Sequence, residues 1–289
     1  MQFIITHTTR YRYARPVWLE PHVLRLRPRS DGSQTLLDFR ARVQPRPVGW
    51  SECLDLDGNA TAQMWFDGLT ESLTVATTST VETRRTNAFD FLLEPWAATV
   101  PMCLPAQLEH ALAPYGYRPH PDDAVTAFAG SVLRDANGQT APYLALLARR
   151  IAERCRPTIR LEGDPQPPEI TLREKTGACR DLAVLFIDAC RALGLGARFV
   201  SGYYGGPVNG ERRYLHAWAE VFLPGAGWRG FDPLQGVAVC DLHVAVAAGA
   251  VPAAAAPISG TMRGASSIAT LDVDLQIEIG NTSGSSVTP

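Results

Sequence analysis

The sequence of 289 residues predicts an α+β protein in which a β-sandwich domain precedes a core of helices and antiparallel strands. Two observations lead to this prediction. The first hundred or so residues alternate apolar and polar side chains in short runs separated by turn signals, as the strands of a sandwich do. Helical periodicity then appears, and from Cys179 onward the pattern is one helix followed by three strands.

Composition and charge exclude several classes of protein. Hydrophobic residues make up 46% of the chain and charged residues 19%, a balance typical of a globular protein with a sizeable core. The net charge of −2 gives no general attraction to nucleic acid or to an anionic membrane, so we expect neither as a partner. The N-terminus lacks the pattern of a signal peptide, and no apolar run reaches the roughly 20 residues that cross a bilayer. The sequence therefore predicts a cytoplasmic protein.

A β-sandwich domain is predicted over residues 1–98. In residues 2–13, apolar side chains stand at alternate positions from Phe3 onward. Asp57-Gly58 is a hairpin turn signal. Further strands are predicted at 37–43, 62–66 and 69–81. This domain contains no cluster of histidine, acid and nucleophile, so we interpret it as a scaffold or a partner-docking domain.

The core is predicted over residues 99–240, after a connector that is rich in proline. Helical periodicity marks residues 122–134 and 140–154. The quartet TLRE at 171–174 has the spacing of a capping box and predicts the start of a short helix.

The last part of the chain, residues 241–289, is predicted to contain C-terminal strands and a tail. Residues 268–279 alternate as a strand does, and a polar, small-residue tail begins at Gly280. The pattern leaves open whether these strands pair with the N-terminal sheet or with the sheet of the core.

Cys179 stands at the start of a predicted helix. Apolar residues recur at helical spacing after it, Gly194 ends the helix, and Gly177 lets the chain enter it sharply. Free backbone N–H groups and the helix dipole at such a position favour a thiolate and can stabilise an oxyanion. Cys190, which lies in the apolar stripe of the same helix, is interpreted as a core residue. Taken alone, a cysteine such as Cys179 is also more often structural than catalytic.

A predicted hairpin brings a histidine near an aspartate. His216 lies in an alternating run, and a turn then leads into a second strand that ends at Asp232. If Phe222 faces Trp228 across this hairpin, Asp232 faces Trp218, on the face that His216 shares. A register shifted by one residue would instead place the histidine and the aspartate on opposite faces.

The runs GACRD and CRALGLGARFVSGY, followed by HAWAEVFLPGAGWRGFDP, resemble the core of bacterial transglutaminase-like proteins, which are relatives of the papain-like thiol enzymes. Residues 1 to about 95 resemble the β-sandwich that precedes this core in the two-domain branch of the family. The resemblance implies a papain-like transglutaminase core with a catalytic triad. In this triad Cys179 is the nucleophile, His216 the base and Asp232 the orienting acid.

The resemblance also implies a mechanism through a thioester. The thiolate of Cys179 attacks the amide carbonyl of a peptide or protein substrate, His216 protonates the leaving amine, and the acyl-enzyme passes its acyl group to water or to another amine. We expect a cysteine hydrolase of peptide or isopeptide bonds. A true transglutaminase, which joins glutamine to an amine, would use the same residues. A non-catalytic interaction protein of this fold would be expected to lack a triad residue, and none is missing.

Four residues near the triad have two interpretations each. Asp181 accompanies the cysteine in the family pattern, and stabilisation of the helix dipole explains it better than a chemical role. Arg180 and Glu220 could bind substrate, although solvated surface charges explain them more simply. Trp218 could line the acyl site, and packing within the strand explains it equally well.

Metals, cofactors and disulfides have little support in the sequence. The six cysteines include no CxxC pair, and no HExxH motif or calcium-binding loop is present. We therefore predict no metal ion and no cofactor, and the sequence makes no prediction of the oligomeric state.

Overall fold

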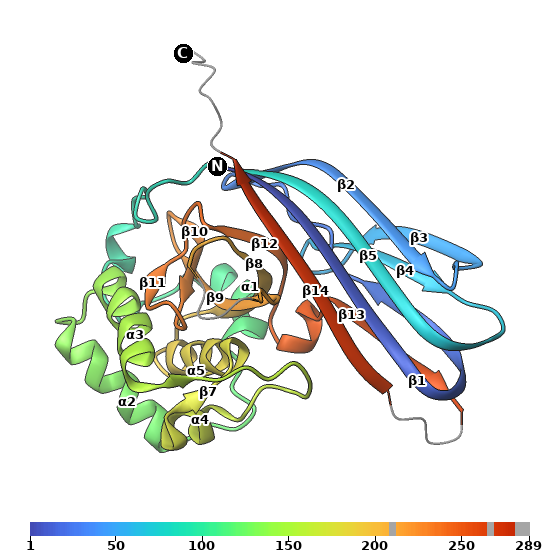
Figure 1. The fold of residues 1–289 in the computed structure, drawn as a ribbon. Coiled ribbons are helices and arrows are strands. Elements are labelled where there is room, and N and C mark those ends of the chain that lie inside the picture. The colour runs from blue at the N-terminus through green and yellow to red at the C-terminus, as the bar shows by residue number, and fades with distance from the viewer. Residues whose placement is uncertain (208–211, 265–268, 281–289) are drawn as a thin grey trace, which may run out of the picture.

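A seven-stranded sheet and a five-stranded sheet, with helices against the second, make up the computed structural model, which describes residues 1–207, 212–264 and 269–280 (Figure 1). This confirms the predicted α+β class. Of the tail predicted from Gly280 onward, only Gly280 itself belongs to the described residues. In the described part of the chain, no helix has the length and apolar character needed to cross a membrane.

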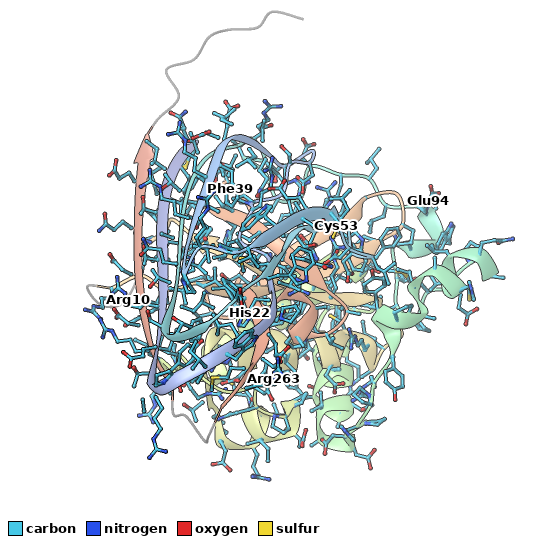
Figure 2. The ribbon with its side chains drawn as sticks, turned by 90° about the vertical axis from the view of Figure 1, so that its right-hand side faces the viewer. Arg10, His22, Phe39, Cys53, Glu94 and Arg263 are labelled. Carbon is cyan, nitrogen blue, oxygen red and sulfur yellow. The ribbon has the colours of Figure 1, made fainter. Side chains whose placement is uncertain are left out.

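The N-terminal sheet is built around one long strand and has the order β2-β5-β1-β4-β3. Its strands are β1 (Gln2–Leu24), β2 (Gln34–Gln44), β3 (Gly49–Leu54), β4 (Ala60–Trp65) and β5 (Leu69–Thr83). The register of β1 against β5 shifts between Arg12 and Val17, and beyond the shift the end of β1 pairs with β4. The predicted turn joins β3 to β4, and Gly58 there has a φ of 79°. Figure 2 faces this sheet, with His22 on β1 and Cys53 on the outer strand β3.

The C-terminal strands divide between the two sheets. Strand β12 (His243–Gly249) pairs with β8 of the core, whereas β13 (Ile258–Arg263) and β14 (Ala269–Gly280) both pair with β1. The alternating run predicted at 268–279 therefore forms β14, except for Ile268, which lies outside the described residues. The chain leaves the N-terminal sheet, builds the core and returns to the first sheet (Figure 1).

The core sheet is antiparallel and has the order β11-β10-β9-β8-β12. Its other strands are β8 (Ala197–Tyr204), β9 (His216–Leu223), β10 (Gly227–Asp232) and β11 (Val237–Ala238). Trp228 pairs with Phe222 across the β9–β10 hairpin, which confirms the register on which the predicted approach of His216 and Asp232 depended.

Five α-helices are present among the described residues: α1 (Ala106–Gly116), α2 (Asp123–Asp135), α3 (Thr140–Arg154), α4 (Pro168–Glu174) and α5 (Cys179–Arg191). Helices α2 and α3 confirm the periodicity read from the sequence, and α1 was not predicted. The predicted helix start at 171–174 is wrong, because this quartet is the second half of α4. A proline suits the first turn, so the helix begins at Pro168, and it ends at Glu174 because the next residue, Lys175, has a left-handed φ of 54°.

Short elements complete the chain. They are the 3₁₀ turns η1 (Pro95–Ala97) and η2 (Pro252–Ala255), and the parallel two-residue strands β6 (Arg156–Pro157) and β7 (Thr176–Gly177). Strand β7 leads directly into α5, so this small pair helps to fix where the helix carrying Cys179 begins.

One apolar cluster joins the N-terminal sheet to the core. Phe3 and Val81 of the first sheet belong to the same buried cluster as Tyr203 and Val244 of the second. The approach is so close that a Cβ atom on Gly205 would lie 2.4 Å from Cε1 of Phe3. The two sheets therefore share a hydrophobic interior and do not merely touch at their surfaces.

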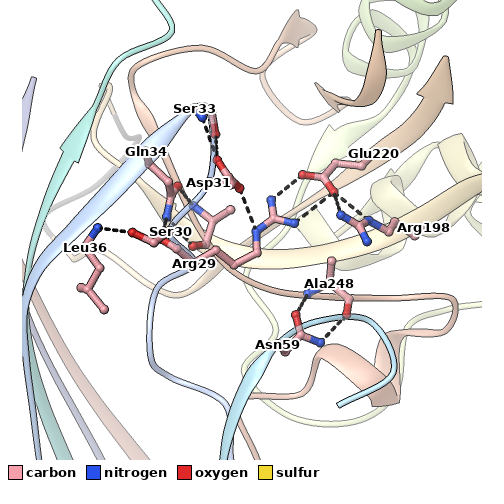
Figure 3. A network of polar contacts seen from close by, with 11 residues as sticks. Arg29, Ser30, Asp31, Ser33, Gln34, Leu36, Asn59, Arg198, Glu220 and Ala248 are labelled. Atoms are coloured by element: carbon pink, nitrogen blue, oxygen red, sulfur yellow. Dashed lines mark hydrogen bonds and ion pairs between the residues drawn. The ribbon is translucent and has the colours of Figure 1, made fainter. Parts of the chain in front are cut away.

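Amide side chains of the N-terminal part cover the free edge of β12 (Figure 3). The amide of Asn59 donates to the carbonyl oxygen of Ala248 at 2.6 Å, and its Oδ1 accepts from the N–H of the same residue at 2.8 Å. Gln34 makes the same double contact with Ala245, at 2.9 and 2.7 Å. Each amide thus takes the place of a neighbouring strand on the edge of the core sheet.

A buried cluster of charges lies at the same interface (Figure 3). Glu220 of β9 accepts hydrogen bonds from Arg29 at 2.6 Å and from Nε of Arg198 at 2.8 Å. Burial alone would raise the pKa of Glu220, but the two guanidinium groups outweigh it and lower the pKa to about 2. The interpretation of Glu220 as a solvated surface charge is wrong, because only 7% of the residue is exposed.

Candidate active site

Cys179 is the first residue of α5, and the turn before it is tightly packed. A Cβ atom on Gly177 would lie 2.9 Å from Cβ of Asp181, so the chain needs glycine there. The first N–H groups of a helix have no partners within the helix and point toward its N-terminus, where Cys179 is half-buried. Cys190 is fully buried in the same helix, and burial raises the pKa of its thiol, in agreement with a core role.

Asp181 stabilises the start of this helix. Its Oδ2 accepts a hydrogen bond from the N–H of Ala178 at 2.8 Å. Its Oδ1 accepts from the N–H of Gln166 at 2.8 Å and from the guanidinium of Arg160. Because both oxygens of this fully buried carboxylate are engaged, Asp181 fixes the loop before α4 to the helix end that carries the thiol.

His216 and Asp232 form a buried pair at the β9–β10 hairpin. Nε2 of His216 donates to Oδ2 of Asp232 at 2.6 Å. The other carboxylate oxygen, Oδ1, accepts from the N–H groups of Leu234 and Gln235 at 2.9 and 3.2 Å. Because Asp232 occupies Nε2 of the imidazole, Nδ1 is the ring nitrogen left for other partners.

The electrostatics of the site connect this pair to the cysteine. Burial alone would lower the pKa of His216, but the charge and the hydrogen bond of Asp232, followed by the neighbouring side chain of Cys179, raise it well above its usual value. Burial raises the pKa of Asp232, but the charge and hydrogen bond of His216 and the hydrogen bond of His243 bring it far below its usual range. The arrangement favours an imidazolium beside the sulfur, with the carboxylate ionised.

Trp218 and Arg180 take different positions around this centre. Trp218 is completely buried, and a Cβ atom on Gly202 would lie 2.4 Å from its ring. It therefore packs the sheet and does not line an open cleft. Arg180 donates to the backbone carbonyl of Glu162, and burial, with the neighbouring charge of Arg160, lowers its pKa.

His243, at the start of β12, was not predicted from the sequence. Its Nε2 donates to Oδ2 of Asp232 at 3.0 Å, the same oxygen that His216 contacts. The ring of Tyr204 is tilted against both imidazoles, with ring centroids 5.7 Å from His216 and 4.9 Å from His243. The only signal in the sequence is a histidine that immediately precedes the apolar run of a buried strand.

The two histidines and the aspartate are also residue types that bind metals. In the part of the chain that the structure describes, His216, Asp232 and His243 are the one such group, with ligand atoms within 4.8 Å of one another. Both Nε2 atoms already donate to one carboxylate oxygen, so the three side chains are hydrogen-bonded to one another. A metal ion would have to replace both hydrogen bonds.

Comparison with known proteins agrees with the fold. Residues 3–82 match the family described as the bacterial transglutaminase-like N-terminal region, and residues 129–233 match the transglutaminase-like superfamily. The second match contains Cys179, His216 and Asp232.

Individual relatives differ in how much of the chain they cover. An uncharacterised protein of Mycobacterium tuberculosis is 26% identical over 294 residues, which cover 96% of this chain and 92% of that protein. A protein-glutamine gamma-glutamyltransferase of Pseudomonas aeruginosa is 38% identical over 71 residues, which cover 22% of this chain and 11% of that protein. The crystal structure of a candidate cysteine protease from Cytophaga hutchinsonii has a TM-score of 0.69 at 21% identity, and covers 98% of this chain and 92% of its own. This last likeness shows a shared fold.

Proposed function

Because the chain belongs to the bacterial transglutaminase-like proteins, with both the N-terminal region and the core of that family, we propose that it is a cysteine-dependent hydrolase of peptide or isopeptide bonds. One observation supports this most directly. His216 of β9 and Asp232 of β10 form a buried hydrogen bond of 2.6 Å, and Cys179, at the start of α5, lies near enough to His216 to raise the pKa of its imidazole. The proposed substrate is a peptide or protein, and a cytoplasmic location stays a prediction.

The geometry suggests how the reaction proceeds. An imidazolium at His216 keeps the sulfur of Cys179 as a thiolate, which attacks the amide carbonyl. The N–H groups at the start of α5 are donors for the oxyanion that forms. His216 then gives its proton to the leaving amine, and a thioester remains on Cys179. Asp232 holds the imidazole in place throughout and stabilises its positive charge.

The thioester can be resolved in two ways. In hydrolysis, His216 takes a proton from water, which attacks the thioester and restores the thiol. In amine transfer, an amine takes the place of water. Hydrolysis is our primary proposal because water reaches any site open to solvent, whereas transfer needs a site that binds the amine and excludes water. The similarity to the Pseudomonas aeruginosa gamma-glutamyltransferase makes transfer the second candidate function.

Product analysis on a glutaminyl peptide separates these two reactions. The peptide is incubated with the enzyme, with and without a large excess of a primary amine, and the products are identified by mass spectrometry. We expect the hydrolysed peptide in both samples, in amounts that the amine does not change. Conversion of most of the product into the amine adduct would instead establish the transferase reaction.

A further inference from the structure

His243 makes a contact with Asp232 that packing alone does not explain. The residue is 5% exposed, and among the described residues its side chain makes one hydrogen bond, which Nε2 donates to Oδ2 of Asp232. Its Nδ1 is buried without a hydrogen-bond partner in the described part of the chain. A buried polar atom without a partner costs about 1–3 kcal/mol, so an apolar side chain would suit this position better if stability were its only role.

Asp232 receives two donors on each carboxylate oxygen. Backbone N–H groups of Leu234 and Gln235 fix Oδ1, while the imidazoles of His216 and His243 fix Oδ2. The backbone donors hold one oxygen of the carboxylate, and the two imidazoles hold the other. The imidazoles come from different strands, so His243 adds a second, independent contact to the oxygen that orients His216.

The N-terminal part of the chain holds the segment that contains His243. On one side, Oγ1 of Thr83 donates to the carbonyl oxygen of Asp241 at 2.8 Å. On the other side, the amide of Gln34 binds both backbone groups of Ala245. Contacts from the first domain thus lie two residues before and two residues after His243.

The ring of His243 is also fixed laterally within the core. Trp218 meets it edge to face, with the ring centroids 5.3 Å apart, and Tyr204 packs at 4.9 Å. The N-terminal domain holds the backbone on both sides of His243, and the core holds its ring. The imidazole therefore presents its Nε2–H to Asp232 in a fixed direction.

We propose that His243 is a positioning residue for the reaction at Cys179, through which the N-terminal domain sets the orientation of Asp232 and so of His216. The expected effect of His243 on kcat rests on the proposed function. It assigns to the N-terminal domain a role in the active site, in addition to any role as a scaffold.

Three substitutions of His243 test this role. His243→Gln keeps an N–H donor near the place of Nε2, His243→Phe keeps the ring without a donor, and His243→Asn has a donor that falls short of Asp232. We expect His243→Phe and His243→Asn to lower kcat on the glutaminyl peptide by roughly 10- to 100-fold with little change in KM, because a misplaced catalytic group costs about that much. His243→Gln should recover most of kcat.

A second readout does not depend on the substrate. The rate at which iodoacetamide alkylates Cys179 in the folded protein should fall in His243→Phe and His243→Asn and recover in His243→Gln. The control is His22→Phe, which alters a buried histidine of the N-terminal sheet and should leave both readouts unchanged (Figure 2).

The two proposals fail in different ways. Wild-type kcat and wild-type alkylation in His243→Phe and His243→Asn overturn the role of His243 and leave the proposed function standing. Equal losses in all three variants also overturn it, because they show that only the shape of histidine matters. A wild-type protein that is alkylated rapidly at Cys179 but cleaves no amide removes the proposed function, and the alkylation rates still decide the role of His243.

Discussion

Replacement of Cys179 by alanine should reduce kcat/KM for amide cleavage by at least about 10³-fold, since removal of a nucleophile eliminates the covalent route. The protein should remain folded, because the side chain is half-buried at a helix end and leaves no large cavity. Cleavage of the glutaminyl peptide by wild type and variant, with circular dichroism as a check on folding, measures the effect.

The matched control for this prediction is another free cysteine. Cys53 is exposed on β3 of the N-terminal sheet, and Cys53→Ala should keep wild-type kcat/KM (Figure 2). A folded Cys179→Ala variant that retained a tenth or more of the activity would assign the chemistry to another group.

Glu220→Gln should destabilise the folded protein by about 3–5 kcal/mol, the cost of leaving buried charges without a partner. Glu220 neutralises Arg29, which comes from the N-terminal domain, and Arg198, whose guanidinium lies 4.2 Å from the centre of the Trp228 ring. Without the carboxylate, two buried cations face each other across the interface. Urea unfolding of both proteins at neutral pH gives the difference in free energy.

The control for this substitution is Glu153→Gln, which removes an exposed ion pair with Arg149 on α3. We expect a loss of less than about 0.5 kcal/mol there. If the two substitutions cost the same, the buried cluster does not stabilise the interface.

The pH dependence of stability follows from the same carboxylate. The pKa of Glu220 falls from 4.5 to about 2 on folding, so its contribution is fully present above pH 4.5 and is lost as the pH falls toward 2. Stability of the wild type should therefore decline over this range more steeply than that of Glu220→Gln.

Two parts of the proposed site could be predicted from local rules. Helical spacing placed Cys179 at a helix start, and the assumed pairing of Phe222 with Trp228 gives the strand register that brings Asp232 to His216. Both are short-range relationships, in which a residue and its neighbours decide the direction of the side chain.

Long-range relationships could not be predicted in the same way. Glu220 is a charged residue in an alternating strand, so the sequence pattern indicated a surface charge. Its partner Arg29 lies 191 residues away in the chain, and no local pattern connects the two. The role proposed for His243 likewise depends on its contact with Asp232, and the strands that carry these two residues are not neighbours in the sheet. Pairing of β13 and β14 with β1 depends on the whole fold, and the sequence pattern left it open.

The most direct test of the central claim is the rate of alkylation of each cysteine in the folded protein at pH 6. A free thiol has a pKa of about 8.5 and hardly reacts at this pH, whereas a thiolate paired with an imidazolium does. Cys53 and Cys103 are exposed and serve as internal references. We predict that iodoacetamide labels Cys179 first in the wild type, and that His216→Ala slows this labelling by more than about tenfold. Labelling of Cys179 no faster than that of the two exposed cysteines, or at a rate that His216→Ala leaves unchanged, would contradict a thiolate–imidazolium pair and with it the enzymatic assignment.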